Sequence, residues 1–236
     1  LVGSEMCIRD SRYTDRGEVY NRRQGGSITI NGGIVCTELR TSGGAHTADS
    51  FGIGTCGGNG GSVTINGGTI IAEASSSAIS SGRGGSITIN GGNVTAHGGI
   101  NRYENQPLYA IPGNGIGSLE GGSITINGGT VKATAEGKGF GIGGSRFEII
   151  GTATVTINGG TIEATANHNN AAIGDKGKGE SGVTINGGVI HAIGKGGAAG
   201  IGRQLEKLKA KPRIVVGSVG RILDLIRKKK IQAHLV

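Results

Sequence analysis

One short pattern of alternating residues, most often Ser-Ile-Thr-Ile-Asn-Gly-Gly, recurs six times between residues 25 and 188. The copies begin at Ser27, Ser62, Ser86, Ser123, Thr154 and Gly182. In each copy two β-branched apolar residues flank a threonine, and this period of two is typical of a strand with one buried face. The Asn-Gly-Gly that follows supplies residues that tolerate a positive φ. Each copy therefore predicts one short strand followed by one corner.

Two further strand-like pieces follow every copy in the same order. The first is a second alternating run, such as Val131-Lys132-Ala133, and the second is a lone isoleucine between small residues, such as Ile142. The asparagines of successive copies are 35, 24, 37, 31 and 28 residues apart. Repeats of about 20 to 50 residues indicate a solenoid, and short apolar strands with glycine corners favour the β kind. The sequence therefore predicts an all-β fold over residues 25–202, a right-handed three-sided parallel β-helix (β-solenoid) of about six coils.

Stacked coils would place equivalent residues in columns. We expect the isoleucines and valines of the repeated pattern to point inward and form the core. We expect its asparagines to hydrogen-bond to one another along the corner and to adopt the left-handed conformation there. The outward threonines are explained by threonine pairing between strands. A flat threonine face also resembles the ice-contacting side of some β-solenoid antifreeze proteins, which leaves ice binding as an alternative function.

Composition divides the chain into unlike parts. Glycine accounts for 51 of 236 residues and aromatic residues for only 3%, which excludes an ordinary globular core. Residues 203–236 contain ten basic and two acidic residues, which equals the whole net charge of +8. We therefore expect a foreign or disordered leader over residues 1–24, the β-helix over 25–202, and a short basic α/β appendage, a helix-strand-helix fragment, over 203–236.

Both end segments resemble unrelated sequences. The first eleven residues, LVGSEMCIRDS, resemble translated sequencing-adapter read-through. The segment RQLEKLKAKPRIVVGSVGRILDLIRKKKIQAH resembles a piece of a DEAD-box RNA helicase, with Ser218-Val219-Gly220-Arg221 standing where that family has Thr-Pro-Gly-Arg. The resemblance implies that Gly220 and Arg221 contact an RNA backbone, but the motifs for ATP hydrolysis are absent. A chimeric join is the favoured hypothesis; the alternative is a native basic tail that binds nucleic acid or anionic cell wall.

The second alternating run is where outward residues differ between coils. Glu38, Glu73 and His97 fall in one column, and Lys132 and Glu163 are neighbours in the adjacent one. The lysine and glutamate are explained as a surface ion pair. Two stacked glutamates beside a histidine are less easily explained, because like charges on neighbouring strands repel unless a cation, a proton or a ligand intervenes.

Two long insertions leave the repeats near this column, over Leu39–Ser50 and Gly98–Asn114. With a bare coil between them, they should form the walls of a groove floored by Ile71 and Glu73. Loops on a rigid scaffold often carry binding residues. Tyrosine with amide and carboxylate neighbours suits a sugar ring, although the tyrosines could equally serve only to pin the loop. The candidate carbohydrate-binding residues are Glu38, Glu73, His97, Asn101, Tyr103, Glu104 and Tyr109.

The repeat unit GGSITINGGTVKATA…GFGIGG is similar to that of carbohydrate-binding β-helix families of secreted and surface bacterial proteins. The resemblance implies a polysaccharide or cell-wall glycan as partner and an extracellular or cell-surface location. Members that bind calcium carry Asp-rich corners, whereas this chain has Gly52-Ile53-Gly54 and Gly141-Ile142-Gly143. We therefore expect no cofactor and no metal, with calcium as the alternative left open.

Three functions remain open at this point. The first is a non-catalytic binding module, the second is a structural stalk or adhesin segment, and the third is a polysaccharide lyase or glycosidase with Arg40 or Arg102 near the glutamates. We favour them in that order, because no catalytic arrangement can be placed. Cys36 and Cys56 could form a disulfide or remain free thiols. No signal peptide or membrane span is visible in the sequence.

Overall fold

The computed structural model describes residues 24–38, 51–54, 59–100, 113–118, 121–144, 153–168, 170–175, 182–197 and 199–202. These ranges contain all six copies of the repeated pattern. The helix-strand-helix appendage expected over residues 203–236 lies outside them, as does nearly all of the leader.

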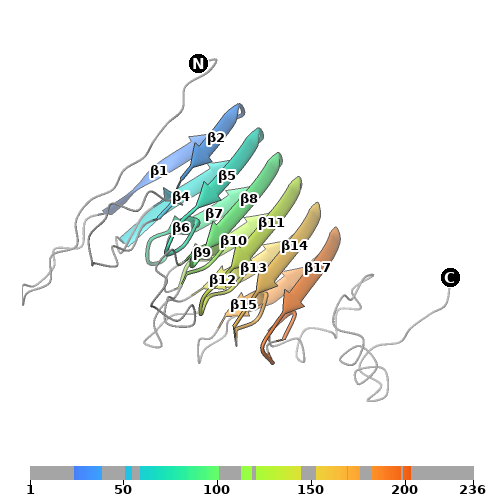
Figure 1. Ribbon diagram of the computed structural model, residues 1–236. Coiled ribbons are helices and arrows are strands. Elements are labelled where there is room, and N and C mark those ends of the chain that lie inside the picture. The colour runs from blue at the N-terminus through green and yellow to red at the C-terminus, as the bar shows by residue number, and fades with distance from the viewer. Residues whose placement is uncertain are drawn as a thin grey trace, which may run out of the picture.

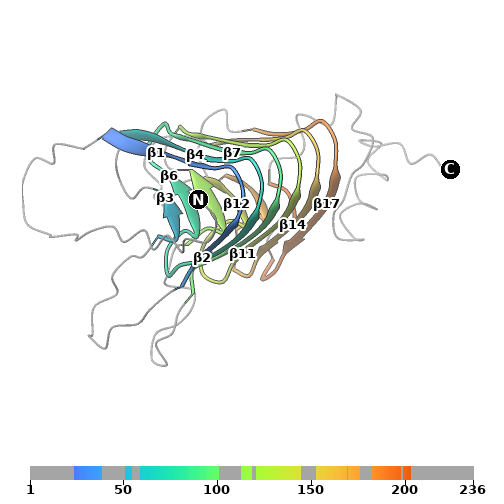
Figure 2. The same ribbon diagram turned by 90° about the horizontal axis from the view of Figure 1, so that it is seen from above.

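Three parallel sheets enclose the interior of the described chain (Figures 1 and 2). The first sheet follows the order β1-β4-β7-β10-β13-β16 and consists of β1 (Gln24–Ile30), β4 (Asn59–Ile65), β7 (Ser86–Ile89), β10 (Ser123–Ile126), β13 (Thr154–Ile157) and β16 (Val183–Ile185). The second follows the order β2-β5-β8-β11-β14-β17 and consists of β2 (Ile34–Thr37), β5 (Thr69–Glu73), β8 (Asn93–Gly98), β11 (Thr130–Ala135), β14 (Thr161–Ala166) and β17 (Val189–Gly194). The third follows the order β3-β6-β9-β12-β15 and consists of β3 (Ile53–Gly54), β6 (Ile79–Ser81), β9 (Ile116–Ser118), β12 (Ile142–Gly144) and β15 (Ile173–Asp175). Consecutive strands pass from sheet to sheet and neighbours within a sheet are one coil apart, so the predicted three-sided parallel β-helix is confirmed.

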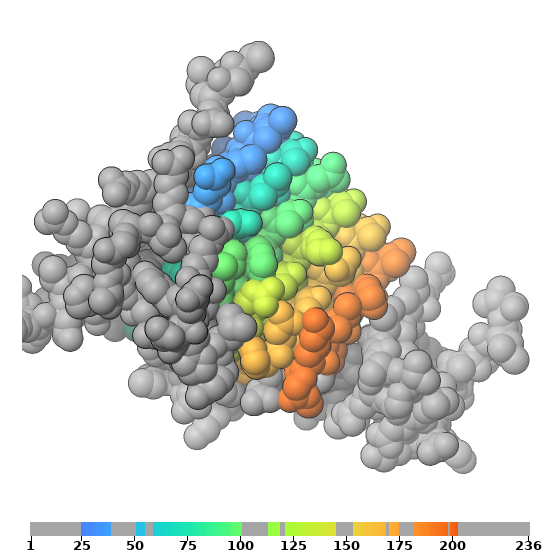
Figure 3. Space-filling model, in the orientation of Figure 1, coloured from blue at the N-terminus to red at the C-terminus, as the bar shows by residue number. Residues whose placement is uncertain are grey.

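Six coils are present, as the six copies of the pattern predict. The sixth coil reaches the third sheet through a single parallel bridge between Ile173 and Ile201. Figure 3 shows the coils as adjacent bands that follow one another in chain order. The described residues contain no helix, and therefore no helical segment there could cross a membrane.

The core is a stack of branched aliphatic side chains from all three sheets. Strand pairing keeps equivalent residues in register; for example, Ile124 lies between Ile87 and Val155. The lone isoleucines of the third sheet are buried in the same cluster as the paired isoleucines and valines of the first. In the outermost coils Ile28, Val183 and Ile185 are only partly buried, because each has a stacked coil on one side only among the described residues. The inward column expected from the sequence is confirmed.

The predicted asparagine column is a continuous hydrogen-bonded ladder at the corner between the first and second sheets. Each Nδ2 donates to Oδ1 of the preceding asparagine at 2.7 Å, through Asn31, Asn66, Asn90, Asn127, Asn158 and Asn186. Stacked amides of this kind are a known source of stability in layered β-structures. The outward threonines are likewise in register, as Thr88 and Thr125 show.

The left-handed residue at this corner is the second glycine of each Asn-Gly-Gly, where the sequence analysis assigned that conformation to asparagine. Gly129, for example, has φ +86°, and a Cβ built on it would lie 2.5 Å from the carbonyl oxygen of Gly92 in the coil before. Glycine is needed there both for its backbone conformation and for the close approach of stacked coils. The asparagine contributes its side chain to the ladder.

Candidate functional site

The outward face of the second sheet is the irregular face of the solenoid. One of its columns runs Cys36, Ile71, Thr95, Lys132, Glu163 and His191, and no two neighbours in it are identical. This differs from the first sheet, where threonine follows threonine along the whole stack. Residues that do not repeat are not explained by ladder formation, so the search for a functional site begins on this face.

The next column contains the predicted acidic and histidine residues. Glu73 is the register partner of His97, and Glu38 follows Thr37, whose partner is Ala72, so Glu38 continues the same column. Glu38 is exposed, whereas Glu73 and His97 are half-buried. On the far side of His97 the column continues with Thr134. The register thus brings the three residues together, while their role in binding stays a prediction.

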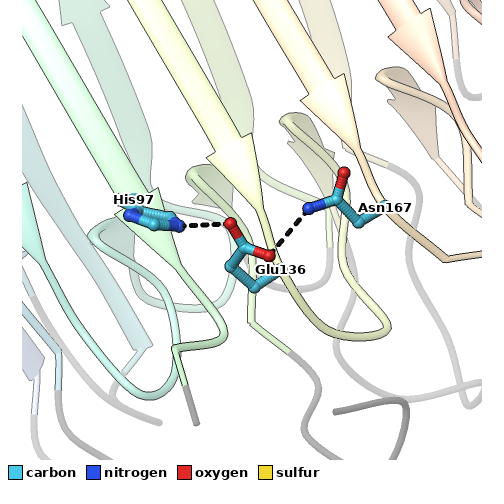
Figure 4. Close-up of polar contacts among 3 residues, drawn as sticks. All are labelled: His97, Glu136 and Asn167. Atoms are coloured by element: carbon cyan, nitrogen blue, oxygen red, sulfur yellow. Dashed lines mark hydrogen bonds and ion pairs between the residues drawn. The ribbon is translucent and has the colours of Figure 1, made fainter. Parts of the chain in front are cut away.

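His97 makes its polar contact with a residue that the sequence analysis did not select. Its Nε2 lies 2.8 Å from Oε1 of Glu136, in the next coil (Figure 4). Asn167, one coil further on, donates from Nδ2 to Oε2 of Glu136 at 2.8 Å. Three side chains from three consecutive coils therefore form one chain of hydrogen bonds; we call His97, Glu136 and Asn167 the relay.

The relay occupies the point where the second sheet ends. Glu136 and Asn167 directly follow the buried residues Ala135 and Ala166, the last residues of β11 and β14. Both backbone amides still donate to the preceding coil, Glu136 to Gly98 and Asn167 to Ala135. The backbone is thus held by the stack, and the side chains bridge the coils beyond the strand ends.

One polar atom of the relay has no hydrogen-bond partner among the described residues. This atom is Oδ1 of Asn167, which is buried. Both oxygens of Glu136 are engaged, one by each neighbour. An acceptor that is buried without a donor costs free energy, so this atom calls for an explanation.

The second insertion leaves the coil close to the relay. Before it, the amides of Gly99 and Ile100 donate to the carbonyl oxygens of Ser76 and Ala74. After it, buried Asn114 accepts from the amide of Phe140 at 2.9 Å through Oδ1. The ends of the expected Gly98–Asn114 loop therefore belong to the solenoid itself, since Gly98 is the last residue of β8.

Several predicted residues lie outside the described ranges. They are Asn101, Tyr103, Glu104 and Tyr109 of the second insertion, Gly220 and Arg221 of the tail, and Cys56. The groove walls over Leu39–Ser50 and within 101–112 lie outside them too. Its proposed floor is described: Ile71 is 41% exposed and Glu73 is half-buried. Cys36 is an exposed free thiol.

A further charged pair on this sheet is the one expected. Nζ of Lys132 lies 3.1 Å from Oε1 of Glu163, and both side chains are about half exposed. Within the described ranges, no group of three or more histidine, cysteine, aspartate or glutamate residues is arranged to hold a metal ion. The arrangement on this face is therefore suited to hydrogen bonding by carboxylate, imidazole and amide groups.

The sequence analysis missed Glu136 and Asn167 because they stand one residue past the alternating runs. A signal was present: an alignment of the coils on their alanines places Glu136, Asn167 and Lys195 in one column after VKATA, IEATA and IHAIG. Three consecutive coils carry a different polar side chain there.

Comparison with known proteins supports the solenoid and finds a short helicase-like stretch. The family model described as "Beta helix repeat" matches residues 63–83, 87–122, 124–146, 155–178 and 183–202. A 40-residue stretch is 62% identical to the DEAD-box ATP-dependent RNA helicase CshC of Bacillus cereus and 48% identical, over the same length, to the probable ATP-dependent RNA helicase YfmL of Bacillus subtilis. That stretch is 17% of this chain and spans only 10% and 11% of the two helicases. No solved structure matches the chain significantly.

Proposed function

We propose that this chain, which belongs to the Beta helix repeat family, is a secreted or cell-surface module that binds polysaccharide. The binding surface is the edge of the second sheet that carries Glu38, Glu73 and His97. The observation that carries the proposal is the break in the repeats at this edge: the asparagine column pairs with itself, whereas here carboxylate and imidazole side chains of neighbouring coils lie half-buried beside one another.

The chemistry of this edge suits a sugar. Carboxylate and imidazole groups hydrogen-bond hydroxyl groups, and the partly exposed Ile71 offers an apolar surface beside them. Ligand sites combine apolar surface with a few placed polar groups in this way. Asn101, Tyr103, Glu104 and Tyr109 belong to the insertion that starts beside His97 and complete the proposed site, with the tyrosines stacking on sugar rings.

A glycan array probed with the whole chain tests the proposal. We expect binding to polysaccharide fragments that weakens at least about tenfold for Glu73→Ala or Tyr103→Ala, because each removes a direct contact. Glu163→Ala is the matched control, since it removes a carboxylate from the same sheet that is already paired with Lys132. Binding that survives both site changes would refute this location, and a depolymerisation assay on the bound glycans would reveal a lyase or glycosidase.

A structural stalk is the second candidate, and the asparagine ladder favours it. Five amide hydrogen bonds of 2.7 Å run the length of the described solenoid, which suits a rigid spacer. A wild-type chain that binds no glycan on the array would favour the stalk.

We infer that the helicase-like stretch is a fragment joined to the β-helix and adds no helicase activity, because it spans about a tenth of the helicases that it matches. Long-read sequencing of the source locus tests this inference. One uninterrupted reading frame through codons 190–215 would contradict the join and would make RNA binding by the basic tail the next property to measure.

A further inference from the structure

The two ends of the asparagine ladder carry opposite hydrogen-bonding groups. Each later asparagine donates from Nδ2 to the coil before it, so the ladder has a direction. Among the described residues, Nδ2 of Asn31 has no preceding coil to accept its bond, and Oδ1 of Asn186 has no following coil to donate one. Both side chains are exposed. The first coil therefore ends the ladder in a donor, and the last coil ends it in an acceptor.

Backbone groups at the same corner repeat this polarity. At each of the five junctions between described coils, the amides of the asparagine and of the residue after the second glycine donate to the coil before, at 2.7–2.9 Å. In the first coil these amides belong to Asn31 and Ile34. In the last coil the matching carbonyl oxygens are those of Ile185 and Gly188. The first coil, blue in Figure 1, and the last coil, orange, lie at opposite ends of the stack, so each end presents what the other lacks.

One outward column beside this corner is apolar only at its two ends. It runs Ile34, Thr69, Asn93, Thr130, Thr161 and Val189. The side chains of Ile34 and Val189 are 70% and 60% exposed, more than any other large hydrophobic side chain in the described ranges. An end-to-end contact between two chains would place these two side chains next to each other and remove apolar surface from water.

The corner of the first coil is open to such a contact. A Cβ built on Gly33 meets nothing within 4 Å, whereas a Cβ on its counterpart Gly68 would lie 2.5 Å from the carbonyl oxygen of Gly33. The described solenoid begins in the first sheet at Gln24 and ends in the third sheet at Gly202, and neither point is at the corner between the first and second sheets.

We propose that this chain associates end to end with a second copy of itself, the first coil of one copy stacking on the last coil of the next. The donors of the first coil then meet the acceptors of the last coil in the register that the internal coils use, and Ile34 packs beside Val189. A contact between two first coils would instead bring the donors of this corner against one another. The end-to-end contact leaves one coil free at each end, so it builds open chains of more than two copies. It holds whether or not the chain binds a glycan.

Sedimentation equilibrium of the whole chain over a range of concentrations tests the proposal. We expect the average mass to rise with concentration beyond that of a dimer, because an open contact does not close after two copies. The protection of the Ile34 amide from hydrogen exchange should rise over the same range.

Two variants each block one end of the chain. Asn31→Asp keeps the oxygen that accepts from Asn66 but replaces the free donor with a charged acceptor, so it should weaken association at least about tenfold. Val189→Glu places a charge in the apolar contact and should weaken association about three- to tenfold. Thr161→Glu is the matched control, because it adds the same charge to the same column one coil earlier, and it should associate like the wild type.

A mixture of the two blocked variants tests the polarity of the contact. The last coil of Asn31→Asp and the first coil of Val189→Glu are both unchanged, so the mixture should form dimers at concentrations at which each variant alone is monomeric. Circular dichroism of each variant checks that the β-helix is retained.

Four outcomes would overturn the proposal. A wild type that stops at the dimer has a closed contact, and a mixture that does not recover association has no first-to-last contact. Thr161→Glu that weakens association as much as Val189→Glu places the contact on the face of the second sheet. A wild type that stays monomeric, with the Ile34 amide protected at every concentration, has its first coil covered by its own chain.

Discussion

A pair of glycines in one coil allows the cost of stacking to be measured apart from the cost of backbone conformation. Gly121 and Gly129 both have positive φ, +74° and +86°. A Cβ on Gly121 meets nothing within 4 Å, whereas a Cβ on Gly129 would lie 2.5 Å from the carbonyl oxygen of Gly92 and 2.8 Å from the carbonyl carbon of Gly91. Alanine at the two positions should therefore differ in its steric effect and little else.

The magnitudes follow from these two terms. A non-glycine residue in the left-handed region costs about 1–2 kcal/mol, and both substitutions incur that cost. Overpacking typically adds about 1–3 kcal/mol, and only Gly129→Ala incurs it. The stabilising loss of freedom in the unfolded chain is common to both and cancels in the difference. We expect Gly121→Ala to lower the free energy of unfolding by about 1–2 kcal/mol and Gly129→Ala by about 2–5 kcal/mol.

Urea denaturation of the full chain measures the difference, and hydrogen exchange locates it. Because the coils of a solenoid can unfold separately, the free energy of unfolding measured for the whole chain must be complemented by a measurement at individual residues. The amide of Thr130 donates to the Gly92 oxygen at 2.9 Å, so its protection should fall in Gly129→Ala and stay unchanged in Gly121→Ala. If the two variants lower the free energy of unfolding by amounts that agree to within about 0.5 kcal/mol, the stacked coils move apart to accommodate the methyl group, and the steric reasoning is wrong.

Two further comparisons use neighbouring or equivalent residues. Ile70→Ala should lower the free energy of unfolding by about 2–5 kcal/mol, because Ile70 is fully buried. Ile71→Ala changes a side chain that is 41% exposed, so it should lower the free energy of unfolding by less than about 1 kcal/mol. Equal effects of the two variants in urea denaturation would contradict the assigned faces of β5. Asn127→Ala removes two ladder hydrogen bonds and should lower the free energy of unfolding by about 1 kcal/mol. Asn186→Ala removes the single bond to Asn158 and should lower it by about half as much. A larger decrease for Asn186→Ala would argue against the ladder as a source of stability.

The scaffold could be predicted because every coil repeats the same alternation of apolar and polar residues followed by Asn-Gly-Gly. Alternation places Ile124 and Ile126 on the same face as their counterparts, and a register shift by one residue would turn them to solvent. The asparagine ladder was predictable for the same reason. The backbone conformation of the corner was assigned to the wrong residue, because asparagine and glycine both tolerate a positive φ and only the stacking of the coils shows how closely Gly129 approaches Gly92.

The candidate site could be predicted only in part. Glu73 and His97 lie within the alternating run, so their shared column followed from the period. Glu136 and Asn167 lie beyond it, where the chain leaves the second sheet and alternation no longer says which way a side chain points. The contact between His97 and Glu136 joins residues of different columns, and no period within one sequence repeat predicts such a diagonal contact.

The contrast between repeating and irregular columns also bears on where this fold places recognition. A column of identical residues uses its own hydrogen-bonding groups: each asparagine amide of the ladder is bonded to the next, and the hydroxyl of Ser62 donates to that of Ser27. Such a column has little specific chemistry left for a partner. His97 instead pairs with Glu136 across coils, and Oδ1 of Asn167 has no donor among the described residues. A solenoid whose stability is distributed over many equal coils can tolerate that loss in one place, so the least regular column is the one in which a binding function costs the fold least.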